Sequence, residues 1–360
     1  MHKIVVNLKD RTYPIHVGTG TLSHAGEIVA SFSPHKVMII TNPLVQSLVG
    51  NKLQISLQKA GLKFCRTVVP DGESYKTLST AKRLYDEMIK NGIERDSMVI
   101  AFGGGVIGDL AGFVASTFMR GIPFIQIPTT LLAQVDASIG GKVAVDHPAG
   151  KNLIGSFYQP KAVIIDCSVL NTLNIKDFKN GLAEVIKTAA IRDEGLFSLI
   201  EKNLELIISK DSEMLQDVVS RTCNHKAKVV STDEREGGIR AILNYGHTFG
   251  HALETLGGYS RLKHGEAVMA GMILAARLAL QTDVCSHETA FRQENLIRRV
   301  GLNRKVFSFK PNDVMGAMST DKKKKSGNLR FILTKKIGSA IIAGDIPAKE
   351  VLYVLKNFTK

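Results

Sequence analysis

Three histidines lie close together in the second half of the chain, among glycines and small side chains. His247 and His251 are four residues apart, so a helix would place both on one face. His264 directly precedes Gly265 and the apolar run 267–280, and is expected to begin a second helix. Imidazole is the commonest metal ligand, and a pair of helices is a rigid support for it. The cluster therefore favours a metal site over histidines that only cap or pack.

A further ligand is available from a distant segment. A catalytic zinc site generally has three protein ligands and leaves one position for the substrate. Glu184 lies in a helix-like stretch and is a candidate for the third position. Spacing alone favours His247 and His251 as the paired imidazoles, although it permits this pairing without requiring it.

A glycine-rich turn in the first half is a candidate phosphate site. The strand-like segment 97–102 runs into Gly103 to Gly108, and a helix-like segment follows. Glycine lets the backbone approach a phosphate, and a helix N-terminus offers free N–H groups and a positive dipole end. The acidic residue expected about twenty residues later in a dinucleotide fingerprint is missing. Asp71 and Glu73, which follow the preceding strand, are expected to reach a ribose instead. A turn with only a packing role is the alternative.

Hydroxyl groups, an acid and lysines follow this turn. Thr129, Thr130 and Lys142 lie in a loop-to-helix stretch, and Gly150-Lys-Asn152 comes soon after. Hydroxyls and lysines near glycines suit phosphate contacts. Asp136, within the apolar part of this stretch, requires a partner because an unpaired buried charge is unfavourable.

These residues must be positioned by two different kinds of structure. The first half reads as an opening hairpin (3–8, 13–17), strands at 36–41, 63–69, 97–102, 123–127 and 162–165, and helices at 44–59 and 78–90. Such alternation implies a parallel sheet with helical crossovers. Later segments are helix-like, at 177–191, 194–208, 213–230, 246–256, 264–282 and 287–300, with strands at 329–334 and 339–343. We predict a Rossmann-like α/β NAD-binding domain over 1–172 and a mostly helical metal- and substrate-binding domain over 173–360.

Composition narrows the classes of protein. Hydrophobic content of 44% and charged content of 22% are ordinary for a globular chain of 360 residues. No apolar run is long enough to cross a bilayer, and the N-terminus reads as a strand and not as a secretion signal. Four scattered cysteines favour a reducing cytoplasm. The net charge of +14 suits nucleic acid, an acidic surface or an anionic small substrate, and no nucleic-acid module signature accompanies it.

Taken together, the motifs resemble the 3-dehydroquinate synthase family from about Lys36 to Ala340. The segments that carry the resemblance are 71–76, 103–109, 119–121, 127–142, 150–152, 181–187, 233–240, 244–251 and 321–323. The resemblance implies a lyase that converts 3-deoxy-arabino-heptulosonate 7-phosphate into 3-dehydroquinate and phosphate. It implies transient oxidation by NAD, β-elimination, re-reduction and an intramolecular aldol closure, within the shikimate pathway of aromatic amino-acid biosynthesis. A divalent ion, zinc or cobalt, is the second cofactor implied.

The resemblance also implies roles for individual residues. The metal ligands are Glu184, His247 and His264, which replaces the pairing of His247 with His251. Residues matching catalytic or substrate-contacting positions are Arg120, Asp136, Lys142, Asn152, Lys187, Lys226, Glu236, Arg240, Asn244, His251 and a lysine of the pair Lys322 and Lys323. Residues matching cofactor positions are Asn42, Asp71, Gly72, Glu73, Ser74, Tyr75, Lys76, Gly104, Gly105, Val106, Ile107, Gly108, Asp109, Thr129, Thr130, Lys142, Lys151, Val169, Leu170, Asn171 and Thr172.

Within this set the expected contacts differ. Lys142, Asn152 and Lys187 match positions that grip the substrate phosphate, and Arg120 matches a contact from a neighbouring subunit, which implies a homodimer. Another three residues match positions around the substrate carboxylate and hydroxyls; they are Lys226, Arg240 and Asn244. Glu236 and His251 match a relay for the C5 hydroxyl proton.

Two other enzyme classes share part of this pattern. A metal-dependent polyol dehydrogenase has the glycine-rich loop and metal histidines, but it does not require the phosphate-gripping set Lys142, Asn152 and Lys187. A related sugar-phosphate cyclase acts on a different sugar, and Lys226, Arg240 and Asn244 favour a substrate that carries a carboxylate.

Overall fold

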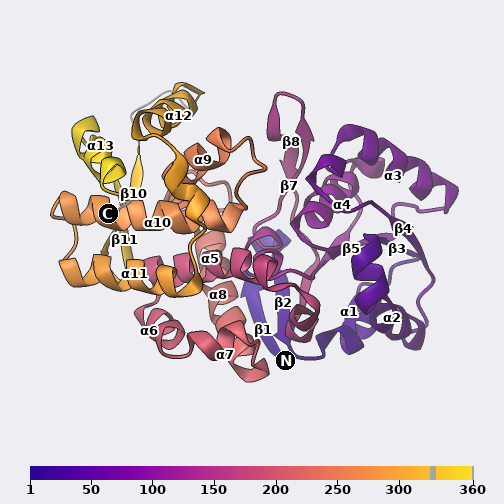
Figure 1. The fold of residues 1–360 in the computed structure, drawn as a ribbon. Coiled ribbons are helices and arrows are strands. Elements are labelled where there is room, and N and C mark those ends of the chain that lie inside the picture. Colours follow the sequence, from indigo (N-terminus) through magenta and orange to yellow (C-terminus); the bar gives the residue numbers. More distant parts are fainter. Residues whose placement is uncertain (325–329, 359–360) are drawn as a thin grey trace. The chain divides into compact units, whose positions relative to one another are not determined.

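The computed structural model describes residues 1–324 and 330–358, and it divides into two compact units (Figure 1). Unit 1 comprises Met1–Phe178 with Lys210–Arg235, and unit 2 comprises Lys179–Ser209 with Glu236–Lys360. The division differs from a single cut after residue 172. It falls within α5 (Ile175–Arg192), and α8 (Ser212–Thr232) belongs to unit 1. The physical reason is that α8 buries its apolar face against β1 (His2–Val6) and the turn Ala133–Ala137 of unit 1.

Unit 1 is built on a seven-stranded sheet with the order β1-β2-β9-β6-β5-β3-β4. β1 and β2 form the predicted antiparallel hairpin, and all other neighbours are parallel. The bounds are β2 (Tyr13–Gly18), β3 (Val37–Thr41), β4 (Phe64–Val68), β5 (Met98–Gly103), β6 (Phe124–Pro128) and β9 (Ala162–Asp166). Strands 3, 5, 6 and 9 are buried throughout, as expected for parallel strands covered on both faces.

The two faces of this sheet carry separate apolar cores. Met38 and Ile40 of β3 pack in one core with α3 (Leu78–Lys90) and α4 (Gly105–Thr117). The alternate residues Val37 and Ile39 pack in the other core with α1 (Ala25–Ala30) and α2 (Pro43–Lys59). The α/β class with helices on both faces is thereby confirmed, and it leaves the carboxyl ends of the strands as the place for loops.

A second hairpin in unit 1 was not predicted. β7 (Lys142–His147) and β8 (Gly150–Phe157) pair antiparallel and project away from the main sheet (Figure 1). The helix expected over this stretch is limited to the five-residue π-helical turn Ala133–Ala137. Gly140 and Gly141 both have positive φ and end that turn. The apolar side of β7 then packs on α4.

Unit 2 is mostly helical. The helices are α6 (Glu194–Lys202), α7 (Leu204–Ile208), α9 (His247–Leu256), α10 (His264–Gln281), α11 (His287–Val300), α12 (Pro311–Lys324) and α13 (Ala348–Lys356), with the hairpin β10 (Phe331–Lys336) and β11 (Ser339–Ala343). The predicted helix 194–208 is divided at Asn203, and α12 and α13 were not predicted. α10 is the central element, since nearly all of residues 267–279 are buried by α9, α11, β10 and α13. No helix in the described ranges is both long and apolar enough to cross a membrane.

Candidate active site

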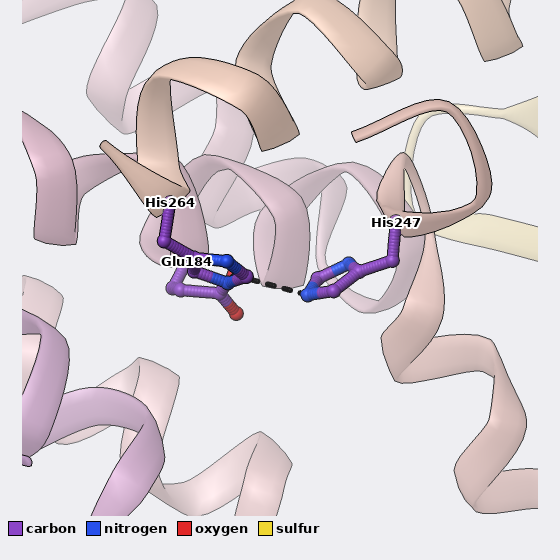
Figure 2. A group of neighbouring side chains, drawn as sticks. All are labelled: Glu184, His247 and His264. Atoms are coloured by element: carbon purple, nitrogen blue, oxygen red, sulfur yellow. Dashed lines mark ion pairs between the residues drawn. The ribbon is translucent and has the colours of Figure 1, made fainter. Parts of the chain in front are cut away.

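Glu184, His247 and His264 converge in unit 2 from three different helices (Figure 2). Glu184 lies within α5, and the two histidines are the first residues of α9 and α10. Glu184 Oε1 lies 3.7 Å from His247 Nε2 and 3.7 Å from His264 Nε2. One ligand atom of each residue lies within 4.8 Å of the others, which suits three bonds to one divalent ion.

The free oxygen of Glu184 is the observation that tests whether a metal fits. Glu184 is 2% exposed, and its Oε1 has no hydrogen-bond partner in the described chain. A buried carboxylate oxygen without a partner is unfavourable unless another group binds it. An ion held between this oxygen and the two imidazoles would satisfy it. The donor set of one carboxylate and two imidazoles suits zinc or a similar transition metal.

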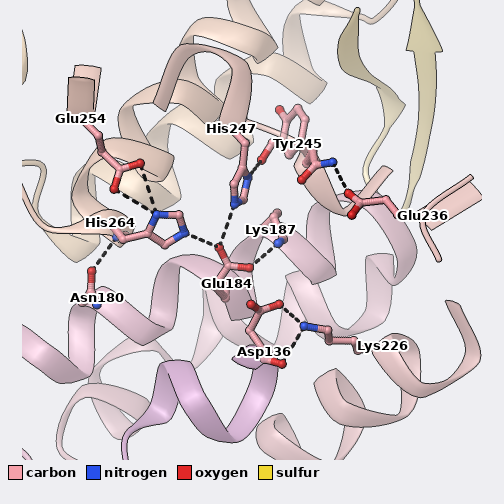
Figure 3. Close-up of polar contacts among 12 residues, drawn as sticks. Asp136, Asn180, Glu184, Lys187, Lys226, Glu236, Tyr245, His247, Glu254 and His264 are labelled. Atoms are coloured by element: carbon pink, nitrogen blue, oxygen red, sulfur yellow. Dashed lines mark hydrogen bonds and ion pairs between the residues drawn. The ribbon is translucent and has the colours of Figure 1, made fainter. Parts of the chain in front are cut away.

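Each of the three side chains is also held from behind (Figure 3). Glu184 Oε2 accepts a short hydrogen bond from Lys187 Nζ. His247 Nδ1 donates to the carbonyl of Tyr245 at 3.1 Å, and His264 Nδ1 donates to Glu254 Oε1 at 3.2 Å. In each histidine the bonded Nδ1 leaves Nε2 facing the Glu184 oxygen. Such outer partners set the tautomer and orientation of a metal ligand.

Close approach of helix backbones brings the two histidines together. A Cβ on Gly271 of α10 would lie 1.9 Å from the carbonyl oxygen of Gly246, directly before α9. A Cβ on Gly265 would lie 2.1 Å from the carbonyl oxygen of Asn180 in α5. The Asn180 side chain accepts a 2.6 Å hydrogen bond from the Gly265 amide. Glycine at these positions therefore permits the helix contacts that place His247 and His264 against Glu184.

The charges of the three residues are strongly coupled. Burial opposes ionisation of Glu184, yet the Lys187 ammonium and the two histidines hold its pKa well below the usual range. Burial and the Lys187 ammonium lower the pKa of His247 to about 3, so this imidazole is neutral at pH 7. Burial also disfavours charge on His264, but the neighbouring carboxylates of Glu184 and Glu254 raise its pKa to about 10. A metal would therefore displace a proton from His264.

His251 does not belong to the converging group. Its ring lies 5.3 Å from that of His247 and 6.3 Å from that of His264, measured between centroids, and the residue is exposed. The pairing of His247 with His251 that spacing favoured is therefore replaced by the set that the resemblance implies. Sharing a helix face brings two rings near each other without directing both at one point.

In unit 1 the glycine-rich turn lies where the strand order changes direction. β3 and β4 extend the sheet one way, and β5 returns to the other side of β3. Ligands of open α/β sheets bind at such a switch point, outside the carboxyl ends of the strands. α4 begins here at Gly105, after Gly104, with no side-chain cap. Its first amide groups are free of helical partners and can bind an anion.

The glycines of this turn have different reasons to be glycine. A Cβ on Gly103 would lie 2.7 Å from Ile107, and one on Gly108 would lie 2.8 Å from Gln126, so both permit packing. A Cβ on Gly105 would meet only Ala137, at 3.5 Å, which is an ordinary contact. The alternative of a purely packing turn therefore explains Gly103 and Gly108 but not Gly105.

Side chains join the loops around this turn. Asn42, directly after β3, caps α2 and donates a short hydrogen bond to Asp71. Lys76 Nζ donates to Asp109 Oδ2 at 2.9 Å, in the first turns of α4. Burial raises the pKa of Asp109 to about 6, although the Lys76 ammonium opposes this shift. The loop after β4 was expected to lie beside the end of β5, but β3 separates the two strands. Lys76, which follows β4, bridges this separation because its side chain bonds to Asp109 in α4.

Comparison with known proteins identifies the family. Residues 66–180 match the family description "3-dehydroquinate synthase N-terminal", and residues 181–324 match "3-dehydroquinate synthase C-terminal". A protein of Desulforamulus reducens named 3-dehydroquinate synthase is 48% identical over 360 residues, which cover 99% of this chain and 100% of that one. The chain belongs to the 3-dehydroquinate synthase family.

Solved structures of related cyclases share the fold of this family member. A 2-epi-5-epi-valiolone synthase from Streptomyces hygroscopicus subsp. jinggangensis, with NAD+ and Zn2+ bound, is 28% identical with a TM-score of 0.88, and the match covers 98% of each chain. A 2-deoxy-scyllo-inosose synthase, complexed with carbaglucose-6-phosphate, NAD+ and Co2+, is 25% identical with a TM-score of 0.88. That match covers 98% of this chain and 99% of the other.

Three other predicted site residues of unit 2, Glu236, Arg240 and Asn244, lie in the segment before α9. Asn244 Nδ2 donates to Glu236 Oε1 at 2.8 Å, and Glu236 has a left-handed backbone with φ of 62°. Arg240 is buried in the turn Ile239–Asn244. The side chains of Lys322 and Lys323 lie outside the part of the chain that the structure describes.

The predicted residues of unit 1 occupy loops at the strand ends and the second hairpin. Asp136 has the partner it was expected to require, because Lys226 Nζ donates to its carboxylate and, at 2.7 Å, to its carbonyl oxygen. Lys151 lies 3.6 Å from Glu73 Oε1, and Lys142 is exposed at the start of β7. Thr129 and Thr130 follow β6, and 169–172 lie in the turn Cys167–Thr172 after β9.

Sequence reasoning missed the residues that support the site. Glu254, Tyr245 and Asn180 each fix a metal-site residue or the start of its helix, and Asp146 accepts a hydrogen bond from the Asn152 amide. Only Glu254 carried a usable signal, since it lies seven residues after His247, two turns along the same helix face.

Proposed function

We propose that the protein is a 3-dehydroquinate synthase, a lyase that converts 3-deoxy-arabino-heptulosonate 7-phosphate into 3-dehydroquinate and phosphate. The conversion proceeds by transient oxidation at C5, β-elimination of phosphate, re-reduction and intramolecular aldol closure. The observation that carries the proposal is the unpartnered Glu184 oxygen facing the Nε2 atoms of His247 and His264. Membership of the 3-dehydroquinate synthase family supports it.

Glu184, His247 and His264 would hold one divalent ion, zinc or cobalt, and the strand-end loops of unit 1 would hold NAD. Related cyclases are described with NAD+ and with Zn2+ or Co2+. When bound, the nicotinamide supplies a reversible hydride acceptor and the ion supplies a Lewis acid. The backbone amides of Gly105 and its neighbours would bind the pyrophosphate at the start of α4.

The remaining charged residues suit an anionic substrate. Lys142, Asn152 and Lys187 would bind the phosphate, together with a lysine of the pair Lys322 and Lys323. Lys226, Arg240 and Asn244 would bind the carboxylate and hydroxyls. An ammonium or guanidinium makes charge-assisted hydrogen bonds with such oxygens, which are about twice as strong as neutral ones.

Glu236 and His251 are suited to proton movement. Glu236 accepts a hydrogen bond from Asn244, and His251 is exposed beside the His247 ring. We assign these two residues to a relay that takes the proton of the C5 hydroxyl. A carboxylate and an imidazole are the usual groups for this work near neutral pH.

Two rival activities are tested by the same chemistry. A polyol dehydrogenase would release NADH as a product and has no use for three phosphate-binding residues. A cyclase for another sugar phosphate shares the metal site and the cofactor. The 48% identity to a named 3-dehydroquinate synthase favours the dehydroquinate activity over the two cyclases, which are 28% and 25% identical.

The experiment is to supply zinc-loaded protein with catalytic NAD and the heptulosonate phosphate, and to follow phosphate release and product formation by NMR. We expect one phosphate and one 3-dehydroquinate per substrate consumed. A matched reaction with glucose 6-phosphate should release none. Phosphate release from glucose 6-phosphate, but not from the heptulosonate phosphate, would instead favour a cyclase for another sugar phosphate.

We also propose a homodimer in which Arg120 binds the phosphate of the neighbouring subunit. Met119 and Arg120 are exposed and both have left-handed backbone, at φ of 49° and 68°. Non-glycine residues hold this conformation only where the surroundings enforce it, often at functional sites. Leu153 and Phe157 of β8 are also exposed, at 62% and 41%, on a strand with a free edge.

The dimer has its own test. Arg120→Ala and His264→Ala proteins should each be inactive alone. Mixed after dissociation, they should regain about a quarter of wild-type activity, because half the dimers are mixed and one of their two sites is intact. Sedimentation as a monomer, or no regain on mixing, would contradict the shared site.

Because the four cysteines are free, we place the protein in the cytoplasm.

A further inference from the structure

The ammonium of Lys76 lies in the interior of unit 1, surrounded by oxygen-bearing side chains. Lys76 is 3% exposed. Its Nζ donates to Asp109 Oδ2 at 2.9 Å and to Asn152 Oδ1 in a shorter bond. Glu73 Oε1 and Asp146 Oδ1 lie 3.5 and 3.8 Å away. An ammonium has three donors and no acceptor, so it can only donate to the oxygens around it.

Asn152 is fixed through both its backbone and its side chain. Its backbone N–H donates to Asp146 Oδ1 at 2.8 Å, and its side-chain oxygen accepts from Lys76. Its φ is 56°, in the left-handed region that asparagine tolerates better than most residues. Asp146 therefore sets the position of this part of the hairpin, and Lys76 sets the orientation of the amide.

Chemistry decides which end of the Asn152 amide faces Lys76. An ammonium can only donate, so the carbonyl oxygen must face it and the NH2 group must point away. In the described chain Asn152 Nδ2 has no hydrogen-bond partner, and the residue is exposed. Two N–H donors are therefore presented to solvent in a fixed direction, and they suit the oxygens of an anion.

Resting on the proposed function, we infer that Lys76 and Asp146 are positioning residues that hold the Asn152 amide with its N–H donors toward the substrate phosphate. Neither residue is required to touch the phosphate. Lys76 is also the link between this amide and the start of α4, through Asp109. Without the ammonium, the amide could turn its oxygen outward and repel the anion that it otherwise binds.

Asp146 gives the cleaner pair of variants. The backbone N–H of Asn152 requires only an oxygen acceptor, so Asp146→Asn should keep the bond and Asp146→Ala should lose it. We expect Asp146→Ala to raise KM for the phosphorylated substrate about tenfold, which corresponds to about 1.4 kcal/mol. Asp146→Asn should stay within about twofold of wild type. Affinity for a substrate analogue without phosphate should change in neither variant.

A double-mutant cycle decides whether Asp146 acts through Asn152. In an Asn152→Ala background, Asp146→Ala should raise KM by less than about twofold, because the group that it positions is gone. Asp86→Ala, which removes an exposed carboxylate from α3, is the matched control and should change nothing. Full additivity of the two substitutions, or equal losses for substrate and phosphate-free analogue, would overturn the inference.

A binding measurement keeps the inference testable if Asp146→Ala does not fold. Titration of wild-type protein with inorganic phosphate should shift the side-chain amide NMR signals of Asn152, assigned by their loss in Asn152→Ala. Unshifted signals would overturn the inference. Failure of wild type to turn over the heptulosonate phosphate would contradict the proposed function. Wild-type turnover that survives Asp146→Ala with unchanged KM would contradict only the positioning role.

Discussion

The candidate metal site of unit 2 and the candidate cofactor site of unit 1 are built in different ways. In unit 2 three side chains from three helices converge, and each is held from behind by a hydrogen-bond partner. In unit 1 the central feature is backbone, where the uncapped start of α4 follows the end of β5. A single substitution removes a side-chain ligand completely. It leaves the backbone amides in place, and several of these amides bind one anion together.

This difference predicts different responses to substitution. Removing one ligand in unit 2 should abolish metal binding, because a catalytic zinc site generally has three protein ligands. Changes in unit 1 should produce graded losses of affinity, because no single amide carries the whole interaction.

His264→Ala should abolish metal binding and turnover. The variant keeps only two of the three converging ligands, so we expect zinc affinity to fall by more than about 100-fold, beyond the range for outer partners. Zinc content after dialysis, and the rise in unfolding temperature on adding zinc, are the measurements. His251→Ala is the control and should retain zinc. Full zinc occupancy in His264→Ala, or its loss in His251→Ala, would break the assignment.

Glu254→Gln should weaken metal binding without removing it. Glu254 accepts from His264 Nδ1, and a glutamine amide holds the imidazole less firmly in the tautomer that offers Nε2. Loss of such a partner generally costs about 10–100-fold in metal affinity. Competition with a chromophoric chelator measures this directly. Glu288→Gln, at an exposed position of α11, is the matched control. Equal zinc affinity in wild type and Glu254→Gln would show that His264 needs no support.

Lys187→Met should weaken binding of the phosphorylated substrate about tenfold or more, since a charge-assisted contact is worth about 1.5–3 kcal/mol. Lys187 also pairs with Glu184, so its loss is expected to change zinc affinity as well. Lys142→Met, in unit 1, should weaken binding of the phosphate without changing zinc affinity. The comparison uses substrate and a phosphate-free analogue at saturating zinc. If Lys187→Met weakened both ligands equally, Lys187 would have no phosphate role.

Gly105→Val should give a graded loss of NAD affinity, of about tenfold, or about 1.4 kcal/mol. The added Cβ meets only Ala137, at 3.5 Å, so we expect folding to be preserved and the effect to fall on the approaching pyrophosphate. Gly103→Val is the contrasting variant and should destabilise the protein, because its Cβ meets Ile107 at 2.7 Å. Fluorescence titration and thermal unfolding separate the two outcomes. Wild-type NAD affinity in Gly105→Val would contradict the cradle.

The sequence predicts the parallel sheet well and the second hairpin poorly, for a physical reason. Buried parallel strands such as 37–41 appear as continuous apolar runs between turn residues, which is a local signal. β7 follows a π-helical turn and two glycines with positive φ, and its strand identity depends on packing against α4. The membership of α8 in unit 1 likewise depends on tertiary contacts that no local pattern specifies.

The candidate site likewise contains residues that sequence motifs predict and supporting residues that only the fold reveals. The set Glu184, His247 and His264 follows from motifs that resemble a known family, whereas spacing alone pairs His247 with His251, which lies outside the converging group. Glu254 and Asp146 act through hydrogen bonds whose partners come from other elements. Such partners are invisible in a single sequence, because their side chains are ordinary acids and only the fold brings them to a ligand.

One isotope experiment tests most directly that oxidation and re-reduction occur within one turnover. The substrate carries deuterium at C5, and the reaction contains zinc and catalytic NAD in the presence of excess unlabelled NADH. We predict that 3-dehydroquinate retains the deuterium on the carbon that derives from substrate C5, that phosphate is released in equal amount, and that NADH does not rise above the amount added. Loss of deuterium into free NADH, or NADH formed in proportion to substrate, would contradict the account and indicate an ordinary dehydrogenase.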